Sequence, residues 1–407
     1  MRLLILGQYY TPEPLPKLSE LATALTKRGH QVSVITGFPN YPTGKLYPGY
    51  KLKLIQRETI DGIPVVRTYE YPYHGKKALG RLVNYGSFMV TALLGVLFSP
   101  PCDLLYVRIP PPNLGITAWL MALIWRVPVV YDVQDIWPDS VVFSGMMRKE
   151  SLSVRIMSRL EKFVYRRAQH LLVTTDGAKE NLIAKGITPE KITVLPNWID
   201  EHIFTEADPA ERQAIRTCYG WENRFVILFA GNIGVVQGLD TVIQACKALP
   251  AASDVLMVFV GDGSDKARLQ KMARDEHLSH RVQFIEQQPF SRMPAFMGAA
   301  DALLVSLQRS EISNLVVPNK TFAYLAAAKP ILAVLGGETP RLIEQIGAGL
   351  AVEPENIPAL IESIQKLESM SPEERALIGE RGRQYLNTHL SFDALISRYE
   401  TLLTGIQ

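Results

Sequence analysis

The sequence has few cysteines and little net charge. Its 407 residues include three cysteines, Cys102, Cys218 and Cys246, which lie far apart and lack metal-ligand spacing. Their scarcity argues against a disulfide scaffold, gives no zinc signature and is typical of a reducing compartment. The 43 Lys and Arg nearly balance the 40 Asp and Glu, so a net charge of +3 gives no argument for a nucleic-acid partner.

Long apolar runs are also lacking. The uncharged segments 82–102 and 109–125 contain polar residues or prolines and fall short of the ~20 residues that a spanning helix needs. We expect core helices there, with an interfacial helix as the alternative. The N-terminal apolar run has no small-residue cleavage site after a long apolar core, so we expect a buried first strand and a cytoplasmic protein.

Basic residues concentrate in one segment of the first half. Residues 147–168 hold seven Lys and Arg against Glu150 and Glu161, which leaves the rest of the chain slightly acidic. One stripe at helical spacing consists of Arg155, Arg159, Lys162 and Arg166. We expect Ile156 and Phe163 on another face of this helix. Such a stripe can lie on anionic lipid at the inner membrane, and a merely solvated face is the alternative.

Short β-rich runs alternate with helical patterns from end to end, which is typical of parallel sheets covered by helices on both faces. The expected strands are residues 3–6, 32–36, 64–69, 104–107, 127–132 and 171–174, then 225–230, 255–260, 282–285, 302–305 and 331–334. The Leu195-Pro196-Asn197 passage predicts a boundary. We therefore predict two doubly wound α/β domains, residues 1–196 and 197–385, with a C-terminal helix in 386–407 that crosses back to the first.

Two glycine-rich loops follow strands of the second half. Gly231-Asn-Ile-Gly234 ends one expected strand and Gly261-Asp262-Gly263 ends the next. A Gly-x-x-Gly turn before a helix lets backbone amides approach a phosphate, although a tight strand-to-helix turn has the same pattern. The dinucleotide fingerprint G-x-G-x-x-G is absent. Because the carboxyl ends of parallel strands share one edge, both loops point to one crevice.

A lysine stands at an unfavourable place in the second half. Pro318 and Asn319 are suited to a helix start, which puts Lys320 in the first turn. A cation there opposes the helix dipole unless an anion lies nearby. This local conflict favours a functional role for Lys320.

The order of motifs resembles the family 4 retaining glycosyltransferases with a GT-B fold, in the branch of bacterial surface-polysaccharide enzymes similar to N-acetylfucosaminyltransferases. The resemblance covers nearly the whole chain. It rests on Tyr9-Tyr10-x-Pro12-Glu13-Pro14, Pro39-Asn40-Tyr41-Pro42-x-Gly44, Tyr131-Asp132-x-Gln134-Asp135-Ile136-Trp137-Pro138, Leu195-Pro196-Asn197-x-x-Asp200 and the Gly231 and Pro318 motifs.

This resemblance implies two Rossmann-like domains facing a cleft, with the acceptor in the first and a nucleotide sugar, usually a UDP-sugar, in the second. It implies transfer with retention to a lipid-linked or saccharide acceptor, without a metal or other cofactor, in polysaccharide, O-antigen or capsule biosynthesis. Asp135 and Glu311 would be the catalytic residues. The nucleotide sugar would lie against Gly231, Asn232, Gly234, Gln237, Gly261, Asp262, Gly263, Asn319, Lys320 and Thr321.

The chain departs from the family pattern at several of these positions. Asn232 and Gln237 stand where many members have Arg and Lys, and Leu315 and Ala323 where many have glutamates. Glu311 or Asn314 could take the sugar-binding role, although Glu311 could equally be an ordinary loop carboxylate. Two other functions stay open: a nucleotide-sugar epimerase of the same fold, and an inactive subunit that only binds a nucleotide sugar.

Overall fold

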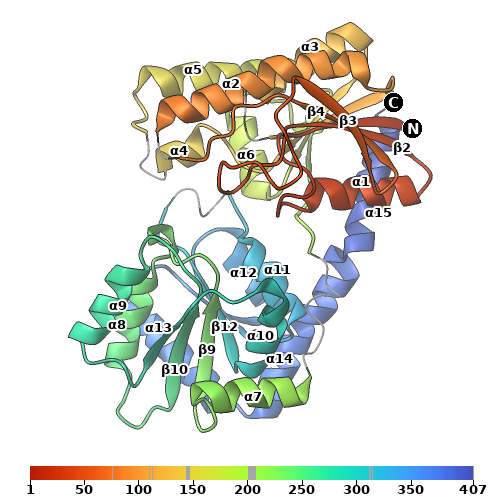
Figure 1. Cartoon of the computed structure of the whole chain (residues 1–407). Helices are drawn as coiled ribbons and strands as arrows, with labels where there is room; N and C mark the ends of the chain where they lie inside the picture. The colour runs from red at the N-terminus through yellow and green to blue at the C-terminus, as the bar shows by residue number, and fades with distance from the viewer. Residues whose placement is uncertain are drawn as a thin grey trace. The chain divides into compact units, whose positions relative to one another are not determined.

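The computed structural model describes the chain except residues 76, 110, 112, 144–146, 200–207, 311, 312, 314 and 407. The chain divides into two compact units (Figure 1). Unit 1 comprises Met1–Leu195 with Ile396–Gln407, and unit 2 comprises Pro196–Leu395. The last helix, α15 (Phe392–Gly405), begins in unit 2 and ends in unit 1.

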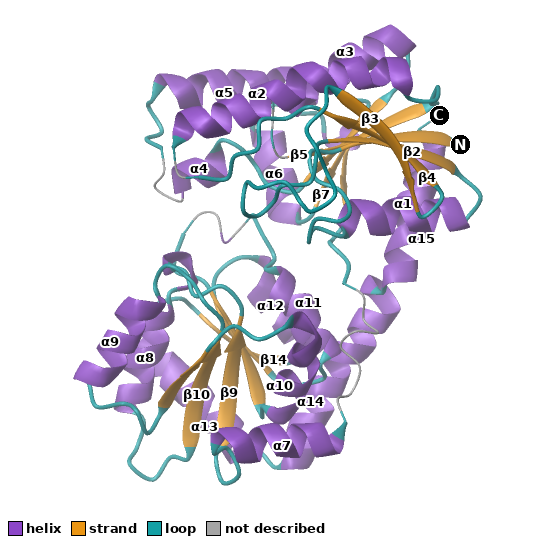
Figure 2. Ribbon diagram, in the orientation of Figure 1, coloured by secondary structure: helices purple, strands orange, loops and turns teal. Residues whose placement is uncertain are grey.

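Unit 1 is built on an eight-stranded sheet with the order β3-β4-β2-β1-β5-β6-β7-β8 (Figure 2). Its strands are β1 (Arg2–Leu6), β2 (Gln31–Thr36), β3 (Ile55–Ile60), β4 (Ile63–Thr68), β5 (Leu104–Ile109), β6 (Val129–Val133), β7 (His170–Val173) and β8 (Ile192–Val194). All pairs are parallel except β3 with β4. The helices are α1 (Lys17–Lys27), α2 (Ala78–Gly95), α3 (Leu114–Trp125), α4 (Asp139–Phe143), α5 (Leu152–Arg167) and α6 (Asp176–Ala184).

Unit 2 has a six-stranded parallel sheet with the order β11-β10-β9-β12-β13-β14. The strands are β9 (Phe225–Ala230), β10 (Val255–Val260), β11 (Val282–Ile285), β12 (Ala302–Ser306), β13 (Ile331–Val334) and β14 (Gly349–Val352). The helices are α7 (Pro209–Tyr219), α8 (Leu239–Ala248), α9 (Lys266–Asp275), α10 (Met293–Ala299), α11 (Asn319–Ala326), α12 (Glu338–Ile346), α13 (Ile357–Ser369) and α14 (Pro372–Tyr385).

The central strands are apolar along their whole length because helices cover both faces of each sheet. Every residue of β9 and β10 is buried. Leu239 of α8, Leu269 of α9 and Leu360 of α13 join these strands in one core cluster. The predicted pair of doubly wound α/β domains is confirmed.

The sequence did not predict β3 or β14, whereas β8 ends just before the predicted Leu195-Pro196-Asn197 boundary. β3 pairs antiparallel with β4, so the expectation of purely parallel pairing is wrong at that edge. Asp61 and Gly62 join the two strands with positive φ at both positions, as a tight hairpin turn requires. β14 is short and begins with a glycine, which weakened its strand pattern.

One expectation about the helices of unit 1 is also wrong. The apolar segment 79–98, which comprises all but the first residue of α2 and the 3₁₀ turn Val96–Phe98, forms a helix of 20 residues that by length and composition could cross a membrane, whereas the sequence predicted a shorter one. On α5, Ile156 is 55% exposed.

Candidate functional site

The carboxyl edge of the unit 2 sheet contains the predicted glycine loops. The chain runs from β9 outward to β10 and β11, and then returns to β12 on the other side of β9. This reversal makes the carboxyl ends of β9 and β12 a topological switch point, the place where open α/β sheets bind ligands. The loop that follows β9 begins at Gly231, at that switch point.

The two glycine loops pack backbone against backbone. The Gly231 N–H donates to Val260 O at 3.0 Å, and the Ile233 N–H donates to Asp262 O at 2.8 Å. A Cβ on Gly261 would lie 2.0 Å from Gly231 O, and Gly261 has a φ of +146°. Only glycine fits there, so Gly261 keeps the two loops in contact.

The second half of the β9 loop is tied to the end of β12. The Gln308 N–H donates to Val236 O at 2.9 Å, and Ser306 Oγ donates to Gln237 O at 2.7 Å. The loop therefore joins the ends of β9 and β12 and has one fixed course over the switch point. Its course directs Gln237 toward α11.

Lys320 lies in the first turn of α11, as predicted. Its Nζ donates to Gln237 Oε1 at 3.0 Å and lies 3.6 Å from the ring centroid of Phe229. A Cβ on Gly231 would be 3.6 Å from the same nitrogen. Within the part of the chain that the structure describes, Lys320 forms no ion pair.

Burial lowers the pKa of Lys320 to about 7. The cause is desolvation of an ammonium group that has a glycine backbone, an aromatic ring and an amide as neighbours. An anion in this place would restore the charged form, and the N-terminus of α11 would add to the attraction. Gln237, Gly231 and Lys320 thus form the part of the predicted site that the structure brings together.

The other predicted donor residues of unit 2 lie around this group. Asn319 Oδ1 accepts a hydrogen bond from Asn197 Nδ2 at 3.4 Å. Thr321 is buried, and its hydroxyl has no hydrogen-bond partner among the described residues. Asn232 and Asp262 are exposed on the two glycine loops. The Gly263 backbone packs against Ile233, where a Cβ would lie 2.3 Å from the carbonyl oxygen.

Tyr324 is a positioning residue that the sequence reasoning missed. Its hydroxyl accepts a hydrogen bond from the Ala230 N–H at 2.9 Å, which fixes α11 against the end of β9. Tyr324 follows Lys320 by four residues, so both side chains lie on one face of the helix. That spacing was the available signal.

Asp135, a predicted catalytic residue, lies in unit 1 after the end of β6. Its Oδ2 accepts a hydrogen bond from Trp137 Nε1 at 3.1 Å, and burial raises its pKa. Glu311, the other predicted catalytic residue, and Asn314, its alternative, lie outside the described residues.

A second group of polar side chains surrounds Asp132, three residues before Asp135. Asp132 accepts hydrogen bonds from Tyr106 Oη at 2.7 Å and from Gln134 Nε2 at 2.5 Å. Arg108 Nη1 lies 3.6 Å from Asp132 Oδ2. Burial lowers the pKa of Lys17 to about 7 at the start of α1. The position of Gln134 is therefore set by Asp132.

A buried carboxyl group, Glu70, connects three loops at the carboxyl edge of the unit 1 sheet. Glu70 accepts hydrogen bonds from Gln8 Nε2 at 3.0 Å and from Asn40 Nδ2. Gln8 Nε2 also donates to Asn84 Oδ1 of α2 at 2.8 Å. Burial raises the pKa of Glu70 to about 8. The sequence did not indicate this cluster because its members lie far apart along the chain.

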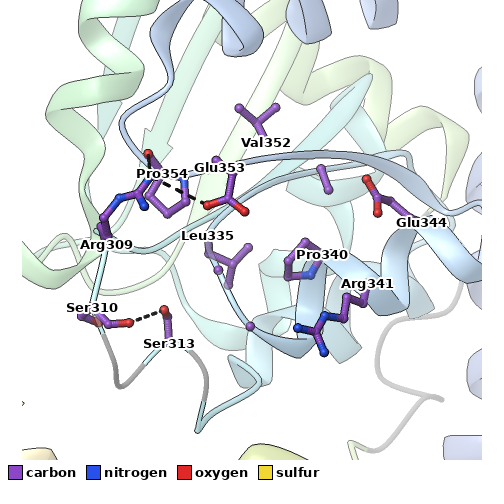
Figure 3. Close-up of a pocket in the computed structure, with 13 residues that line it drawn as sticks. Arg309, Ser310, Ser313, Leu335, Pro340, Arg341, Glu344, Val352, Glu353 and Pro354 are labelled. Atoms are coloured by element: carbon purple, nitrogen blue, oxygen red, sulfur yellow. Dashed lines mark hydrogen bonds and ion pairs between the residues drawn. The ribbon is translucent and has the colours of Figure 1, made fainter.

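A pocket of about 440 Å³ lies at the carboxyl ends of β12, β13 and β14 (Figure 3). Arg309, Ser310, Arg341 and Glu353 are among its polar lining residues. Arg309 Nη2 donates to Pro354 O at 3.2 Å and lies 3.8 Å from Glu353 Oε2. The pocket contains none of the predicted donor residues and lies across β12 from the Gly231 loop. Within the described residues, no group of His, Cys, Asp or Glu is arranged to hold a metal ion.

Two family matches cover most of this chain. Residues 16–198 match the family described as "Glycosyl transferase 4-like domain", and residues 211–385 match "Glycosyl transferases group 1". Together the two matches identify the chain as a glycosyltransferase of the family 4 and group 1 type.

Its relatives include proteins named as glycosyltransferases. WcaI of Escherichia coli K12, named for colanic acid biosynthesis, is 28% identical over 380 residues, which is 90% of this chain and 92% of WcaI. The glycosyltransferase WbjE of Pseudomonas aeruginosa is 27% identical over 263 residues, which is 63% of this chain and 64% of WbjE.

Solved structures confirm the GT-B fold. HepE of Anabaena in complex with UDP matches with a TM-score of 0.74 at 17% identity, and the match covers 100% of both chains. WaaG, a glycosyltransferase involved in lipopolysaccharide biosynthesis, matches with a TM-score of 0.69 at 19% identity, again over 100% of both chains.

Proposed function

We propose that this glycosyltransferase moves a sugar from a UDP-sugar to a lipid-linked or saccharide acceptor, with retention at the anomeric carbon, in surface-polysaccharide biosynthesis. The observation that carries the proposal is Lys320, a half-buried ammonium group without a carboxylate partner in the described chain, beside Gly231 at the switch point. The names of WcaI and WbjE and the UDP bound to HepE support the choice of reaction and donor.

The donor diphosphate is proposed to lie between Lys320 and the Gly231 loop. As the bond from the sugar to the diphosphate breaks, negative charge develops on the leaving oxygen. A preorganised ammonium and a helix N-terminus stabilise such charge most effectively where water is excluded. Lys320 therefore takes the part that a divalent metal ion could otherwise take, and we propose a metal-independent reaction.

Asp135 and Glu311 are proposed as the two carboxylates of the reaction. Burial raises the pKa of Asp135, which makes its carboxylate a better proton acceptor for an acceptor hydroxyl. Glu311 is proposed to contact the donor sugar in place of the glutamates that Leu315 and Ala323 replace. The donor is proposed to be an N-acetylated deoxy or amino sugar.

The test is a transfer assay with radiolabelled UDP-sugars and a lipid-linked acceptor. We expect a labelled product with the original anomeric configuration, and loss of nearly all product for Lys320→Met. Lys329→Met is the matched control, because Lys329 also lies in unit 2 with a pKa lowered by burial but stands after the end of α11. Failure of every donor with folded protein would contradict the proposal.

The same assay, combined with a fluorescence titration of UDP, separates the alternative functions. A changed sugar nucleotide that forms without acceptor would identify an epimerase. Tight UDP binding with no turnover would identify an inactive binding subunit, which Leu315 and Ala323 favour because they cannot accept the hydrogen bonds of a sugar or ribose.

A lipid-linked acceptor would place the reaction at a membrane. We propose that the protein is cytoplasmic and binds the inner membrane as a peripheral protein, with Arg155, Arg159, Lys162 and Arg166 toward the lipid.

A further inference from the structure

Three helices of unit 1 form one layer on the same face of its sheet. α2, α3 and α5 each belong to a crossover that moves the chain in the same direction, from β4 to β5, β5 to β6 and β6 to β7. Right-handed crossovers in one direction put their helices on one face. Figure 1 shows α2, α3 and α5 together on this side of unit 1.

Side-chain contacts hold the three helices together. Thr117 Oγ1 of α3 donates to Met89 O of α2 at 2.9 Å. Trp119 of α3 packs edge-on against Phe163 of α5, with ring centroids 5.1 Å apart. The layer therefore has one continuous outer surface, formed by the sides of the helices that face away from the sheet.

The part of this outer surface formed by α2 and the 3₁₀ turn that follows it, Val96–Phe98, is an exposed apolar stripe. Leu79 is 72% exposed and Leu97 is 77% exposed. The exposed apolar residues are spaced by three or four positions, or by multiples of that spacing, so they lie on one side of the helix. They are Leu79, Leu82, Val83, Val90, Leu94 and Leu97. Leu123 and Ile124 of α3 extend the stripe. No Asp or Glu occurs in residues 78–102.

The α5 part of the surface is basic and carries its own apolar residues. Arg155, Arg159, Lys162 and Arg166 are all exposed. None of the four forms an ion pair with another described residue, so their charges are not neutralised within the described chain. Leu152 and Ile156 are exposed among them. An apolar stripe and a basic stripe thus share one outer surface.

Hydrogen bonds to other segments of unit 1 hold α2 against the sheet of that unit. Asn84 bonds Gln8 and, through its Nδ2, the carbonyl of Tyr71 at 2.6 Å. Thr91 donates to the carbonyl of Tyr69. A helix that crossed a bilayer would break these bonds and expose the polar groups to lipid. The apolar stripe can reach lipid only if α2 lies along the membrane surface.

We infer that the outer surface of α2, α3 and α5 is a docking face for an anionic lipid bilayer, with the apolar stripe inserted at the headgroup boundary and the four basic side chains paired with lipid phosphates. This inference rests on the proposed function, because a lipid-linked acceptor requires the enzyme to reach a membrane. The charge of the face favours a lipid surface over a second copy of this chain. A second copy would bring two basic stripes together, whereas an anionic lipid surface neutralises the basic side chains.

Vesicle flotation of the full chain, without nucleotide sugar, tests the inference. We expect binding to phosphatidylcholine vesicles that contain phosphatidylglycerol, weaker binding at high salt, and little binding to phosphatidylcholine alone. The quadruple variant Arg155→Gln, Arg159→Gln, Lys162→Gln and Arg166→Gln should lose binding by about tenfold or more. The triple variant Leu82→Gln, Val90→Gln and Leu97→Gln should lose it at low salt as well.

Matched controls lie in unit 2. Leu377 is 57% exposed on α14, and Leu377→Gln should bind like the parent protein, as should Lys271→Gln with Arg274→Gln on α9. Equal vesicle binding by the parent protein and all variants would overturn the inference, as would a parent protein that does not bind vesicles. A dimer of the parent protein that the triple variant abolishes would also overturn it. Because flotation needs no turnover, the two proposals fail separately. A parent protein that transfers sugar but does not bind the vesicles contradicts this inference alone, and a parent protein that binds the vesicles but transfers no sugar contradicts only the proposed function.

Discussion

Lys320 combines two properties that oppose each other in the free protein. It is a cation near the amino end of a helix, and burial lowers its pKa from 10.5 to about 7. Between these two pH values the unfolded chain binds more protons at this residue than the folded chain does. The free energy of unfolding should therefore rise with pH in that window.

Replacement of Lys320 by methionine should remove this pH dependence. We expect Lys320→Met to raise the unfolding temperature of the free protein near pH 7 or below, because the variant no longer holds an unpaired charge at a half-buried position. Thermal unfolding across pH 6 to 9 measures this, with Lys329→Met as the control variant. If the unfolding temperature of Lys320→Met varies with pH as that of the parent protein does, the lysine is solvated in the free protein and its site is not one that an anion completes.

Glu70 should give the opposite slope. Burial raises its pKa from 4.5 to about 8, so the folded protein binds more protons here in this window and the free energy of unfolding falls as pH rises. We expect Glu70→Gln to flatten that fall. Urea unfolding at several pH values between 5 and 9 is the measurement. A profile that stays as steep as that of the parent protein would exclude Glu70 as its source.

At the residue scale the sequence predicted the site in part. Glycines after strands and a lysine at a helix start break local rules, and such conflicts are visible without a structure. Phe229 and Tyr324 were missed because an aromatic residue in a strand or helix has an ordinary core role. Glu70 and Gln8 were missed because their contact depends on which loops meet.

At the scale of elements, the contact between the loops after β9 and β10 is the most constrained feature. Gly261→Ala would place a Cβ 2.0 Å from Gly231 O at a φ of +146°. We expect a loss of about 2 to 4 kcal/mol in the free energy of unfolding, from steric overlap and backbone strain. Chemical denaturation measures it.

Gly86 of α2 provides the comparison for that variant. A Cβ there has open space, and Gly86→Ala should stabilise the protein by up to about 1 kcal/mol because alanine favours a helix. Equal effects of Gly261→Ala and Gly86→Ala would contradict the packing described for the two loops.

Strand patterns were predictable where burial is complete. β9 and β10 are apolar throughout, so their existence and bounds follow from composition. The alternating, half-exposed residues of β3 gave a weaker pattern, although Asp61-Gly62 marked its hairpin.

At the scale of the whole molecule, two doubly wound units follow from the alternation of strands and helices along the chain. The family follows from the order of the motifs, since each motif alone is loose. The identity of the donor sugar depends on a few side-chain contacts, which periodicity does not encode. The sequence therefore predicted the fold and the class of reaction better than the substrate.

Metal dependence is a property of the complete reaction. We expect the transfer activity to persist in EDTA at no less than about half its value in Mg²⁺, because Lys320 and the N-terminus of α11 supply the positive charge at the leaving group. Parallel assays in the two buffers measure this. Loss of activity in EDTA that Mg²⁺ restores would contradict the proposed role of Lys320.

The most direct test of the central claim is a thermal-shift titration of nucleotides and nucleotide sugars against the parent protein, Lys320→Met and Lys329→Met. A ligand that binds the folded state raises the unfolding temperature by mass action. We predict a shift with UDP and at least one UDP-sugar for the parent and Lys329→Met, and an apparent affinity weaker by about tenfold or more for Lys320→Met. A UDP-dependent shift of the same size in Lys320→Met would contradict the account.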